Sequence, residues 1–388
     1  MNKQLTQKIH YIGVDDKDID LFESQYIVPN GISYNSYVIL DEKIAIMDTV
    51  DTRKTDEWLN NLEQTLNGRT PDYLVVHHME PDHAGNIGML TTKYPKLTLV
   101  LSNKATQMLP QFFENVNFEN RTLIVKEGET LSLGTHTLQF FMAPMVHWPE
   151  VMVSYEQSEK VLFSADGFGK FGALDHEEDW ACEARRYYFN ICGKYGVQVQ
   201  SLLKKAATLD IAMICPLHGP ILSENLGYYI GLYNTWSKYE PETEGVFVAY
   251  ASIHGGTAAT ALKMAEILRE KGAAKVSIAD LSRDDMAETV EDAFRYSKMI
   301  VAAPSYDAGV FPPMHDFLHH LQSKAYQKRR VGIIENGSWA PSAGRVMNEM
   351  LSSMKNIDIV EPMITIRSRM KDADIIGLET LADAILAD

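Results

Sequence analysis

The chain has 388 residues, of which 45% are hydrophobic, and its formal net charge is −16. A chain of this length is longer than most domains with a single hydrophobic core, and it is long enough for two domains. The negative charge argues against nucleic acid and anionic membrane surfaces as partners. No apolar run approaches the roughly 20 residues that a membrane helix needs. The three cysteines form no CxxC pair and the N-terminus has no apolar secretory stretch, so we expect a soluble protein of the cytoplasm.

The first part of the chain, from about residue 33 to residue 170, consists of short β-rich runs separated by turn-forming residues. Helical patterns return at 197–208 and near 222–239, on either side of a strand predicted at 211–216. The polar stretch KYEPETEG at 238–245 then reads as a linker. It predicts one domain over residues 1–243 and a second over 246–388.

The second part alternates strands and helices regularly. The strand predicted at 246–251 is continuously apolar, further strands are predicted at 275–280, 299–304 and 330–336, and amphipathic helices such as 257–271 separate them. This pattern indicates an α/β domain with a doubly wound parallel sheet. Its size is that of a single five-stranded flavodoxin-like domain.

Seven potential metal ligands follow predicted strands in the first domain. Because a sheet fixes the backbone and short loops aim the side chains, strand ends are suitable places for ligands. A lone histidine after a strand is usually an ordinary core or surface residue, and His77 is expected to be one, since its side chain should point away from that of His78. The joint occurrence of the set instead indicates a metal site. Its members are His78, Glu80, Asp82, His83, His147, Asp166 and His218.

The ligand types indicate which metal binds. The zinc hydrolases of the metallo-β-lactamase superfamily carry HxHxDH, and this chain resembles that pattern with Glu80 in place of the second histidine. Four imidazoles and three carboxylates without a thiolate favour iron or manganese over zinc. Two Fe(II) ions, three carboxylates and a bridging hydroxide would be close to neutral. Asp166 is the expected bridging carboxylate.

A second constellation opens the second domain. A predicted strand leads into Ser-Ile-His-Gly-Gly-Thr at 252–257 and then into a helix, which is an arrangement suited to a monophosphate. Two later strand ends, at 304–309 and 336–344, offer loops for a flavin ring, because ligands of doubly wound folds bind beyond the carboxyl ends of the strands. The residues expected to contact FMN are Ser252, Ile253, His254, Gly255, Gly256, Thr257, Pro304, Ser305, Tyr306, Asp307, Ala308, Gly309, Ser338, Trp339 and Ala340.

Over nearly its whole length the chain resembles the flavodiiron (A-type flavoprotein) family. The resemblance rests on HxExDH at 78–83, HWPE at 147–150, SADGFG at 164–169, RRYYFNI at 185–191, PLHGPI at 216–221 and SxxGxT at 252–257. It implies a metallo-β-lactamase-like αββα sandwich with two irons and a flavodoxin-like domain with FMN. It also implies reduction of dioxygen to water, of nitric oxide to nitrous oxide, or both, and it places Tyr187 and Tyr188 near the substrate pocket.

The resemblance further implies a head-to-tail homodimer, or a dimer of such dimers, in which the FMN of one chain lies against the di-iron site of the other. The sequence carries no rubredoxin-like CxxC…CxxC module and no NAD(P)H-binding extension, so we expect an external electron donor such as rubredoxin. Segment 22–26 has no histidine, whereas some family members place one there. Two alternatives stay open, a dinuclear metallo-hydrolase fused to a flavodoxin and a non-catalytic electron carrier.

Overall fold

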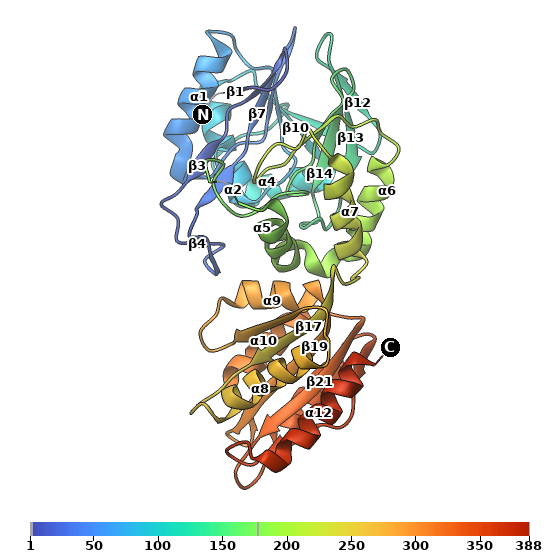
Figure 1. The fold of residues 1–388 in the computed structure, drawn as a ribbon. Coiled ribbons are helices and arrows are strands. Elements are labelled where there is room, and N and C mark those ends of the chain that lie inside the picture. Colours follow the sequence, from blue (N-terminus) through green and yellow to red (C-terminus); the bar gives the residue numbers. More distant parts are fainter. Residues whose placement is uncertain (1–2, 177, 388) are drawn as a thin grey trace. The chain divides into compact units, whose positions relative to one another are not determined.

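The computed structural model describes residues 3–176 and 178–387. Contacts divide the chain into two units (Figure 1), one of Met1–Tyr188 with Val197–Asn234 and one of Phe189–Gly196 with Thr235–Asp388. The chain therefore passes between the units at three places, whereas the sequence suggested one linker. The short segment Phe189–Gly196 joins the second unit because the ring of Phe189 stacks on that of Phe294 at 4.2 Å.

The first unit contains two β-sheets. The seven-stranded sheet has the order β1-β2-β7-β8-β9-β10-β11, and the five-stranded sheet has the order β12-β13-β14-β15-β16. The strands of the first sheet are β1 (Lys3–Gln4), β2 (Ile9–Tyr11), β7 (Tyr37–Leu40), β8 (Ile44–Met47), β9 (Tyr73–Val75), β10 (Thr98–Ser102) and β11 (Thr122–Val125). Those of the second are β12 (Thr130–Ser132), β13 (Thr137–Met142), β14 (Met152–Glu156), β15 (Val161–Phe163) and β16 (Met213–Cys215). Two small ribbons pair β3 (Val14–Asp16) with β6 (Ile32–Tyr34) and β4 (Leu21–Phe22) with β5 (Tyr26–Ile27).

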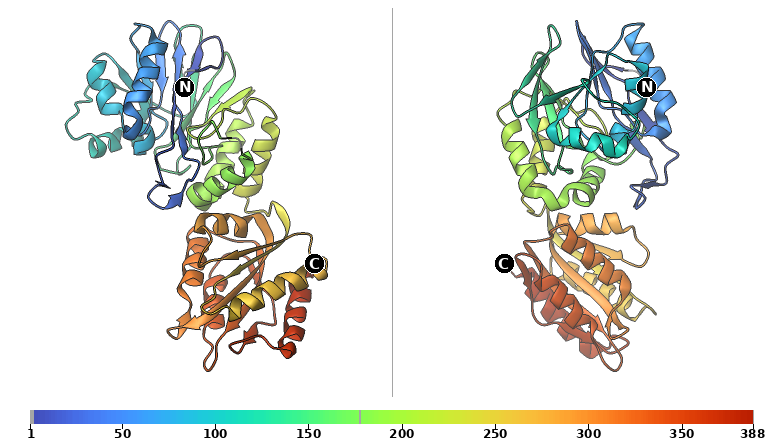
Figure 2. Two further views of the ribbon diagram at one scale, coloured as in Figure 1. Left: turned by 60° about the vertical axis from the view of Figure 1, so that its left-hand side comes forward. Right: turned by 180° about the vertical axis from the view of Figure 1, so that it is seen from behind.

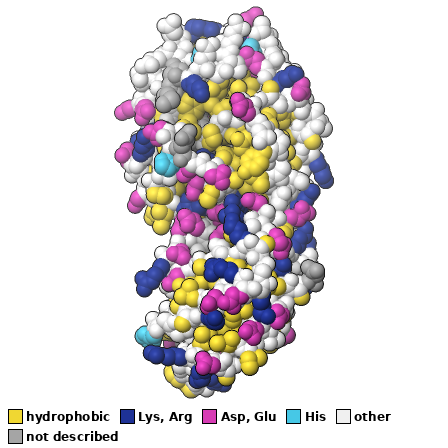
Figure 3. Space-filling model, in the orientation of Figure 1, with side chains coloured by type: hydrophobic (Ala, Val, Ile, Leu, Met, Phe, Trp, Pro, Cys, Tyr) yellow, Lys and Arg dark blue, Asp and Glu magenta, His cyan; other side chains and the backbone are white. Residues whose placement is uncertain are grey.

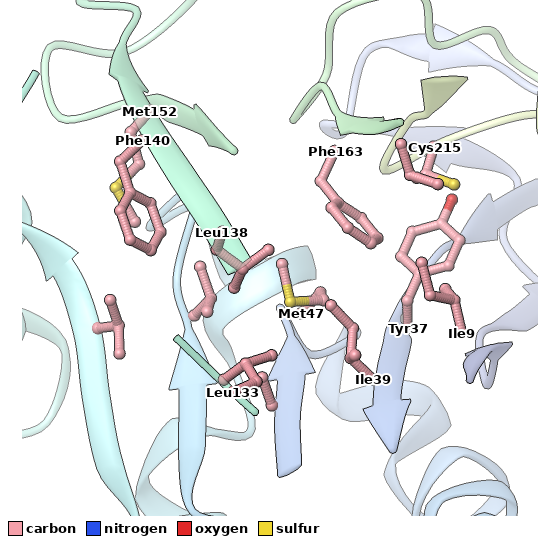
Figure 4. Close-up of a cluster of buried hydrophobic side chains, with 14 of the residues drawn as sticks. Ile9, Tyr37, Ile39, Met47, Leu133, Leu138, Phe140, Met152, Phe163 and Cys215 are labelled. Atoms are coloured by element: carbon pink, nitrogen blue, oxygen red, sulfur yellow. The ribbon is translucent and has the colours of Figure 1, made fainter. Parts of the chain in front are cut away.

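The core of this unit lies between the two sheets (Figure 4). Ile39 and Met47 from the first sheet face Leu138 and Phe140 from the second, and each of the four is at most 1% exposed. Side chains alternate across a strand, so each sheet contributes one apolar face to this layer. The packed faces hold the strand ends that carry the candidate ligands in fixed positions.

Helices cover the outer faces of the sandwich. In Figure 1, α1 lies outside the first sheet, and α6 and α7 lie outside the second. Helix α1 buries Trp58, Leu62 and Leu66 and is followed by Asn67, which adopts the left-handed conformation typical of a helix C-terminus. The longer helices of this part of the chain are α1 (Thr55–Leu66), α3 (Ile87–Lys93), α4 (Asn103–Phe112), α5 (Trp180–Tyr187), α6 (Gly196–Ala206) and α7 (Leu226–Ser237). The arrangement is the predicted αββα sandwich.

The second unit is a parallel sheet with helices on both faces (Figure 2). Its order, β18-β17-β19-β21-β22, is that of a flavodoxin-like fold. The strands are β17 (Thr243–Tyr250), β18 (Val276–Asp280), β19 (Tyr296–Tyr306), β21 (Arg329–Asn336) and β22 (Ile357–Ile359), with β20 (Gly309–Val310) and β23 (Ile364–Ile366) at the ends of β19 and β21. The helices are α8 (Gly256–Glu270), α9 (Met286–Arg295), α10 (Pro312–Ser323), α11 (Ala343–Ser352) and α12 (Asp372–Leu386).

Strand β17 starts earlier than expected. It begins at Thr243, inside the stretch predicted as a linker, because Thr243 already pairs with Tyr296 of β19; the register of the pairing then shifts between Thr243 and Val246. Among the described residues, no helix combines the length and apolarity needed to cross a membrane. Charged side chains of both signs are spread over the visible face of each unit (Figure 3).

Candidate functional site

The seven candidate ligands lie at strand ends of the sandwich. His78 and Glu80 follow β9, and the short helix α2 (Pro81–Ala84) carries Asp82 and His83. His147 lies between β13 and β14, Asp166 follows β15, and His218 follows β16. The seven side chains form two groups, one of four and one of three residues. The groups are His78, Glu80, His147 and Asp166, and Asp82, His83 and His218.

The first group surrounds one small volume. Glu80 Oε2 lies 3.1 Å from His78 Nε2 and 3.1 Å from His147 Nε2. The two histidine nitrogens are 3.3 Å apart. Asp166 Oδ2 lies 3.4 Å from His78 Nε2 and 3.3 Å from His147 Nε2.

The second group uses the other oxygen of Asp166. Asp166 Oδ1 lies 3.2 Å from His83 Nε2, and Asp82 Oδ2 lies 3.3 Å from both His83 Nε2 and His218 Nε2. Asp166 therefore presents one carboxylate oxygen to each group. This is the geometry required of a bridging carboxylate.

The spacing and burial of these atoms fit bound cations. Ligand atoms about 2.1 Å from a shared ion lie about 3.0 to 3.4 Å apart in octahedral to tetrahedral arrangements. Both carboxylate oxygens of Asp82 and of Asp166, and the Nε2 atoms of His83 and His218, are buried without a hydrogen-bond partner among the described residues. A buried polar atom left in this way costs about 1 to 3 kcal/mol. Metal coordination removes that cost.

The electrostatics of the cluster also favour added positive charge. Burial lowers the pKa of His147, but the adjacent carboxylates of Asp166 and Glu80 outweigh burial and raise that pKa to about 9. Burial tends to raise the pKa of Asp166, but His78 and His83 hold it well below its usual range. The carboxylates thus draw positive charge into the site, and metal cations would supply it.

Hydrogen-bond acceptors at the Nδ1 atoms orient the rings of two ligand histidines. Glu150 Oε1 accepts from His78 Nδ1 at 2.8 Å and from the backbone N–H of Met79 at 2.8 Å. The carbonyl oxygen of Ser33 accepts from His218 Nδ1 at 2.7 Å. Because these oxygens only accept, each histidine carries its proton on Nδ1 and turns the lone pair of Nε2 toward the candidate metal. The sequence motif HWPE contained Glu150, but its role was not predicted.

Glu150→Ala should lower the metal affinity of the first group about 10- to 100-fold, because His78 loses the partner that fixes its ring and tautomer. Competition with a chelator of known affinity would measure this loss. Exposed Glu129→Ala is the matched control and should leave the affinity unchanged. An unchanged affinity in Glu150→Ala would show that the buried Glu150 serves only packing.

His77 occupies the core, as the alternation along the strand predicted. Its Nδ1 is hydrogen-bonded to Asp48 and its Nε2 lies 2.8 Å from Ser154 Oγ, and all three residues are at most 1% exposed. The side chain thus points between the sheets and away from the ligand groups.

The two tyrosines highlighted by the sequence have different surroundings. The ring of Tyr187 lies 5.5 Å from that of the candidate ligand His218. The ring of Tyr188 packs edge-on against Tyr233 at 5.2 Å. Tyr187 is therefore the better placed of the two relative to the ligand groups.

Segment 22–26, which lacks histidine, brings a carboxyl group toward the ligands. Loss of water around its carboxyl group, followed by repulsion from the carboxylates of Glu80 and Asp82, raises the pKa of Glu23 to about 7. Sequence reasoning noted the missing histidine and did not identify Glu23.

The second unit has a cavity of about 860 Å³ at the carboxyl ends of its parallel strands. Such a volume suits a ligand the size of a mononucleotide cofactor. Thirteen of the fifteen residues expected to contact FMN line it, while Gly255 and Gly309 do not. Gly255 shapes the loop instead, with φ +83° at the start of α8. The lining residues are Ser252, Ile253, His254, Gly256, Thr257, Pro304, Ser305, Tyr306, Asp307, Ala308, Asn336, Gly337, Ser338, Trp339, Ala340, Pro341, Ser342, Ser368 and Arg369.

Ser368 and Arg369 were missed because the strand before them, β23, was not recognised in the sequence. A short apolar run followed by Arg-Ser-Arg at 367–369 was the available signal. Had the run been read as a strand, the rule that ligands lie beyond strand ends would have included this loop.

The cavity has the features that FMN requires. Helix α8 begins at its edge without a side-chain cap, so the N–H groups of its first turn are available to a phosphate. A Cβ atom at Gly256 would lie 2.4 Å from the carbonyl oxygen of Ser368, so the loops can approach each other only with glycine there. Trp339 is 89% exposed and Tyr306 is 45% exposed, which leaves both rings available to a flavin.

Comparison with known proteins finds relatives that match this chain across both units. Residues 32–219 match the family model described as ODP family beta lactamase. A nitric oxide reductase of Moorella thermoacetica is 29% identical, over 94% of this chain and 92% of that protein. The structure of rubredoxin oxygen:oxidoreductase from Desulfovibrio gigas superimposes with a TM-score of 0.93 and 26% identity, over 99% of this chain and 98% of that one.

The chain belongs to the flavodiiron protein family. A flavodiiron protein of Giardia intestinalis has the same fold, with a TM-score of 0.93 and 23% identity over 99% of this chain and 96% of that one. The predicted family and the predicted pair of folds are thereby confirmed. For this flavodiiron protein, the match across nearly the whole chain includes both the sandwich and the flavodoxin-like unit.

Proposed function

We propose that this flavodiiron protein is an oxidoreductase that reduces dioxygen to water, nitric oxide to nitrous oxide, or both, at a non-haem di-iron site. Its electrons come from an external donor, such as rubredoxin, through bound FMN. The observation that carries the proposal is the seven-residue cluster in which Asp166 faces both ligand groups. The names of the relatives, a nitric oxide reductase and a rubredoxin oxygen:oxidoreductase, support it. We also propose a cytoplasmic location, because the three cysteines form no CxxC pair and no plausible disulfide framework.

The ligands divide between two metal positions. His78, Glu80 and His147 would hold one ion, and Asp82, His83 and His218 would hold the other, with Asp166 shared by both. When bound, the two irons supply Lewis acidity and one-electron redox chemistry, and FMN supplies a store of two electrons. The carboxylates of Glu80 and Asp82 add hard oxygen donors, which favour iron over zinc.

Residues around the ligands would shape the substrate pocket. Tyr187 is fully buried beside His218, in contact with the ring of Phe171 at 5.1 Å. We assign to its hydroxyl a hydrogen bond to the diatomic substrate. The apolar rings around it would exclude water and so strengthen that hydrogen bond. Tyr188 would support this wall through its packing on Tyr233.

In the second unit, residues 252–257 would hold the FMN phosphate at the start of α8, and the loops at 304–309 and 336–344 would hold the ring. Tyr306 and Trp339 are the aromatic side chains available to stack on it. Arg369, from the loop after β23, adds positive charge at the cavity.

Anaerobic turnover with each gas, driven by chemically reduced rubredoxin, tests the function. We expect about two irons and one FMN per chain and consumption of at least one of the two gases. A chain that contains zinc, hydrolyses thioesters or lactams and consumes neither gas would be the fused hydrolase. A chain that exchanges electrons without consuming either gas would be a carrier.

For the assembly we propose a head-to-tail homodimer, or a dimer of such dimers, in which the FMN of one chain serves the di-iron site of the other. Such a closed two-fold arrangement creates two equivalent composite sites. The exposed ring of Trp339 supports the proposal, because an aromatic side chain this exposed beside a cofactor cavity suits coverage by another chain.

Complementation tests this arrangement. A metal-dead chain (His78→Ala with Asp166→Ala) and an FMN-dead chain (Thr257→Asp) would be co-expressed with different tags and the heterodimer isolated. Each mutant homodimer should be inactive, and the heterodimer should have about half the wild-type activity, because one composite site of two is intact. A heterodimer as inactive as its parents would show that electrons pass within one chain.

A further inference from the structure

A third cluster of potential metal ligands lies in the first unit, at the end of β13 and β14 opposite the loop that carries His147. His136 precedes β13, while Glu156 ends β14 and Glu159 lies in the turn before β15. One ligand atom from each of these three residues lies within 4.8 Å of the other two. None of the three has a place in the proposed reaction.

Asp41 fixes the orientation of His136. Its Oδ2 atom lies 2.9 Å from His136 Nδ1 and accepts the backbone N–H of His136 at 2.7 Å. Lys8 Nζ, at 2.6 Å from Oδ1, compensates the charge of Asp41. The hydrogen bonds from Lys8 and His136 outweigh burial and hold the pKa of the Asp41 carboxyl below its usual range. An ionised Asp41 only accepts, so His136 carries a proton on Nδ1.

The other nitrogen of His136 points into the cluster. His136 is 5% exposed, and its Nε2 atom is buried without a hydrogen-bond partner among the described residues. The nearest carboxylate oxygen in an ion-pair geometry is Glu159 Oε2, at 3.6 Å. This separation is too long for a hydrogen bond. It is close to the roughly 3.4 Å between two ligands about 2.1 Å from one tetrahedral ion.

The carboxylates that face this nitrogen also lack a compensating side-chain cation. Glu156 is 0% exposed and accepts only backbone N–H groups in the described part of the chain, those of Ser158 at 2.9 Å and Glu159 at 2.6 Å. Glu159 accepts from the hydroxyl of Thr6. No lysine or arginine within residues 3–176 and 178–387 forms an ion pair with either glutamate. A cation bound between two carboxylates and an imidazole lone pair would compensate buried negative charge, which is costly when it is left alone.

We propose that His136 Nε2 and the carboxylates of Glu156 and Glu159 bind a divalent cation of the Zn²⁺ type, separate from the di-iron centre. One imidazole and two carboxylates with water as a fourth ligand form a set that zinc accepts. Asp41 is the positioning residue, because an imidazole that binds a metal through Nε2 is commonly held by a carboxylate on Nδ1. The ion joins the turn before β13 to the turn before β15 and stabilises that end of the sandwich.

The test uses the full chain with its iron site already filled. Excess Zn²⁺ is added, unbound metal is removed by gel filtration, and zinc and iron per chain are measured in the same sample. The wild type should retain about one more zinc per chain than His136→Gln and than Glu159→Gln, with iron equal in all three. Exposed Glu42→Gln at the same end of the sandwich makes the same change of charge as Glu159→Gln and should retain wild-type zinc.

A second measurement, thermal unfolding, tests the proposal even if one of the variants folds poorly. Zinc at about 100 times its dissociation constant should raise the thermal midpoint of the wild type by several degrees and leave that of Glu159→Gln unchanged. Glu159 is partly exposed in a turn, so its substitution spares the core. Equal zinc content in the wild type and both site variants would overturn the proposal. So would a loss of zinc in Glu42→Gln as large as that in Glu159→Gln. The first result would mean that His136, Glu156 and Glu159 lie together without binding a metal.

Discussion

Asp166→Asn should reduce the iron content from about two per chain to less than one and lower gas reduction at least about a hundredfold. Loss of a residue that hydrogen-bonds to a metal ligand already lowers metal affinity or activity about 10- to 100-fold. The expected loss here is larger because the two oxygens of Asp166 face both ligand groups, at 3.2 to 3.4 Å from three histidine nitrogens. Asparagine would present a neutral oxygen to one ion and an N–H donor to the other. Metal analysis and anaerobic turnover measure the two effects.

Asp175→Asn is the matched control. It makes the same chemical change at an exposed carboxylate paired with Lys17, so both iron and activity should stay at wild-type levels. Two tightly bound irons in Asp166→Asn would contradict the shared position of Asp166. In that case another ligand would have to bridge the ions.

Thr257→Asp should empty the flavin site. Thr257 lies in the first turn of α8, is 3% exposed and lines the cavity. Two like charges 4 Å apart near a protein surface repel by about 4 kcal/mol, which corresponds to about a thousandfold loss of affinity. The carboxylate would also occupy the helix N-terminus that we assign to the phosphate. Absorbance of the purified and denatured protein measures flavin per chain.

Two comparisons make this result specific. Thr380→Asp adds the same charge at an exposed position on α12 and should retain full flavin content. Iron content in Thr257→Asp should stay at about two per chain, because the ligands belong to the other unit. If Thr257→Asp keeps its yellow colour and a normal flavin spectrum, the phosphate binds elsewhere.

Local patterns in the sequence predicted the elements that carry the sites. Largely apolar strands alternating with helices predicted the flavodoxin-like sheet, because strands covered on both faces are mostly apolar. The position of histidines and carboxylates after β-rich runs predicted the ligand loops. The turn at 252–257 predicted the start of α8, where Gly255 adopts a φ of +83°. Each of these signals lies within a few neighbouring residues.

Only the tertiary structure decided how these residues combine. The division of the seven ligands into two groups, with Asp166 facing both, depends on the register of β15 and β16, whose pairing sets Phe163 opposite Cys215. The partners of His78 and His136, namely Glu150 and Asp41, lie 72 and 95 residues away in the chain. No local pattern encodes such a pairing, because it follows from how two sheets pack.

The boundaries of the two units also depend on tertiary contacts that the sequence does not show. Composition predicted a linker at 238–245, whereas contacts give Phe189–Gly196 to the second unit, because Phe189 stacks on Phe294 and Asn190 donates to the carbonyl of Ala287. The sequence by itself thus determined the residue types, many of the strands and helices, and the chemistry available at the loops that follow them. The tertiary structure decided which loops meet, because strand register and sheet packing bring together residues that are far apart in the chain.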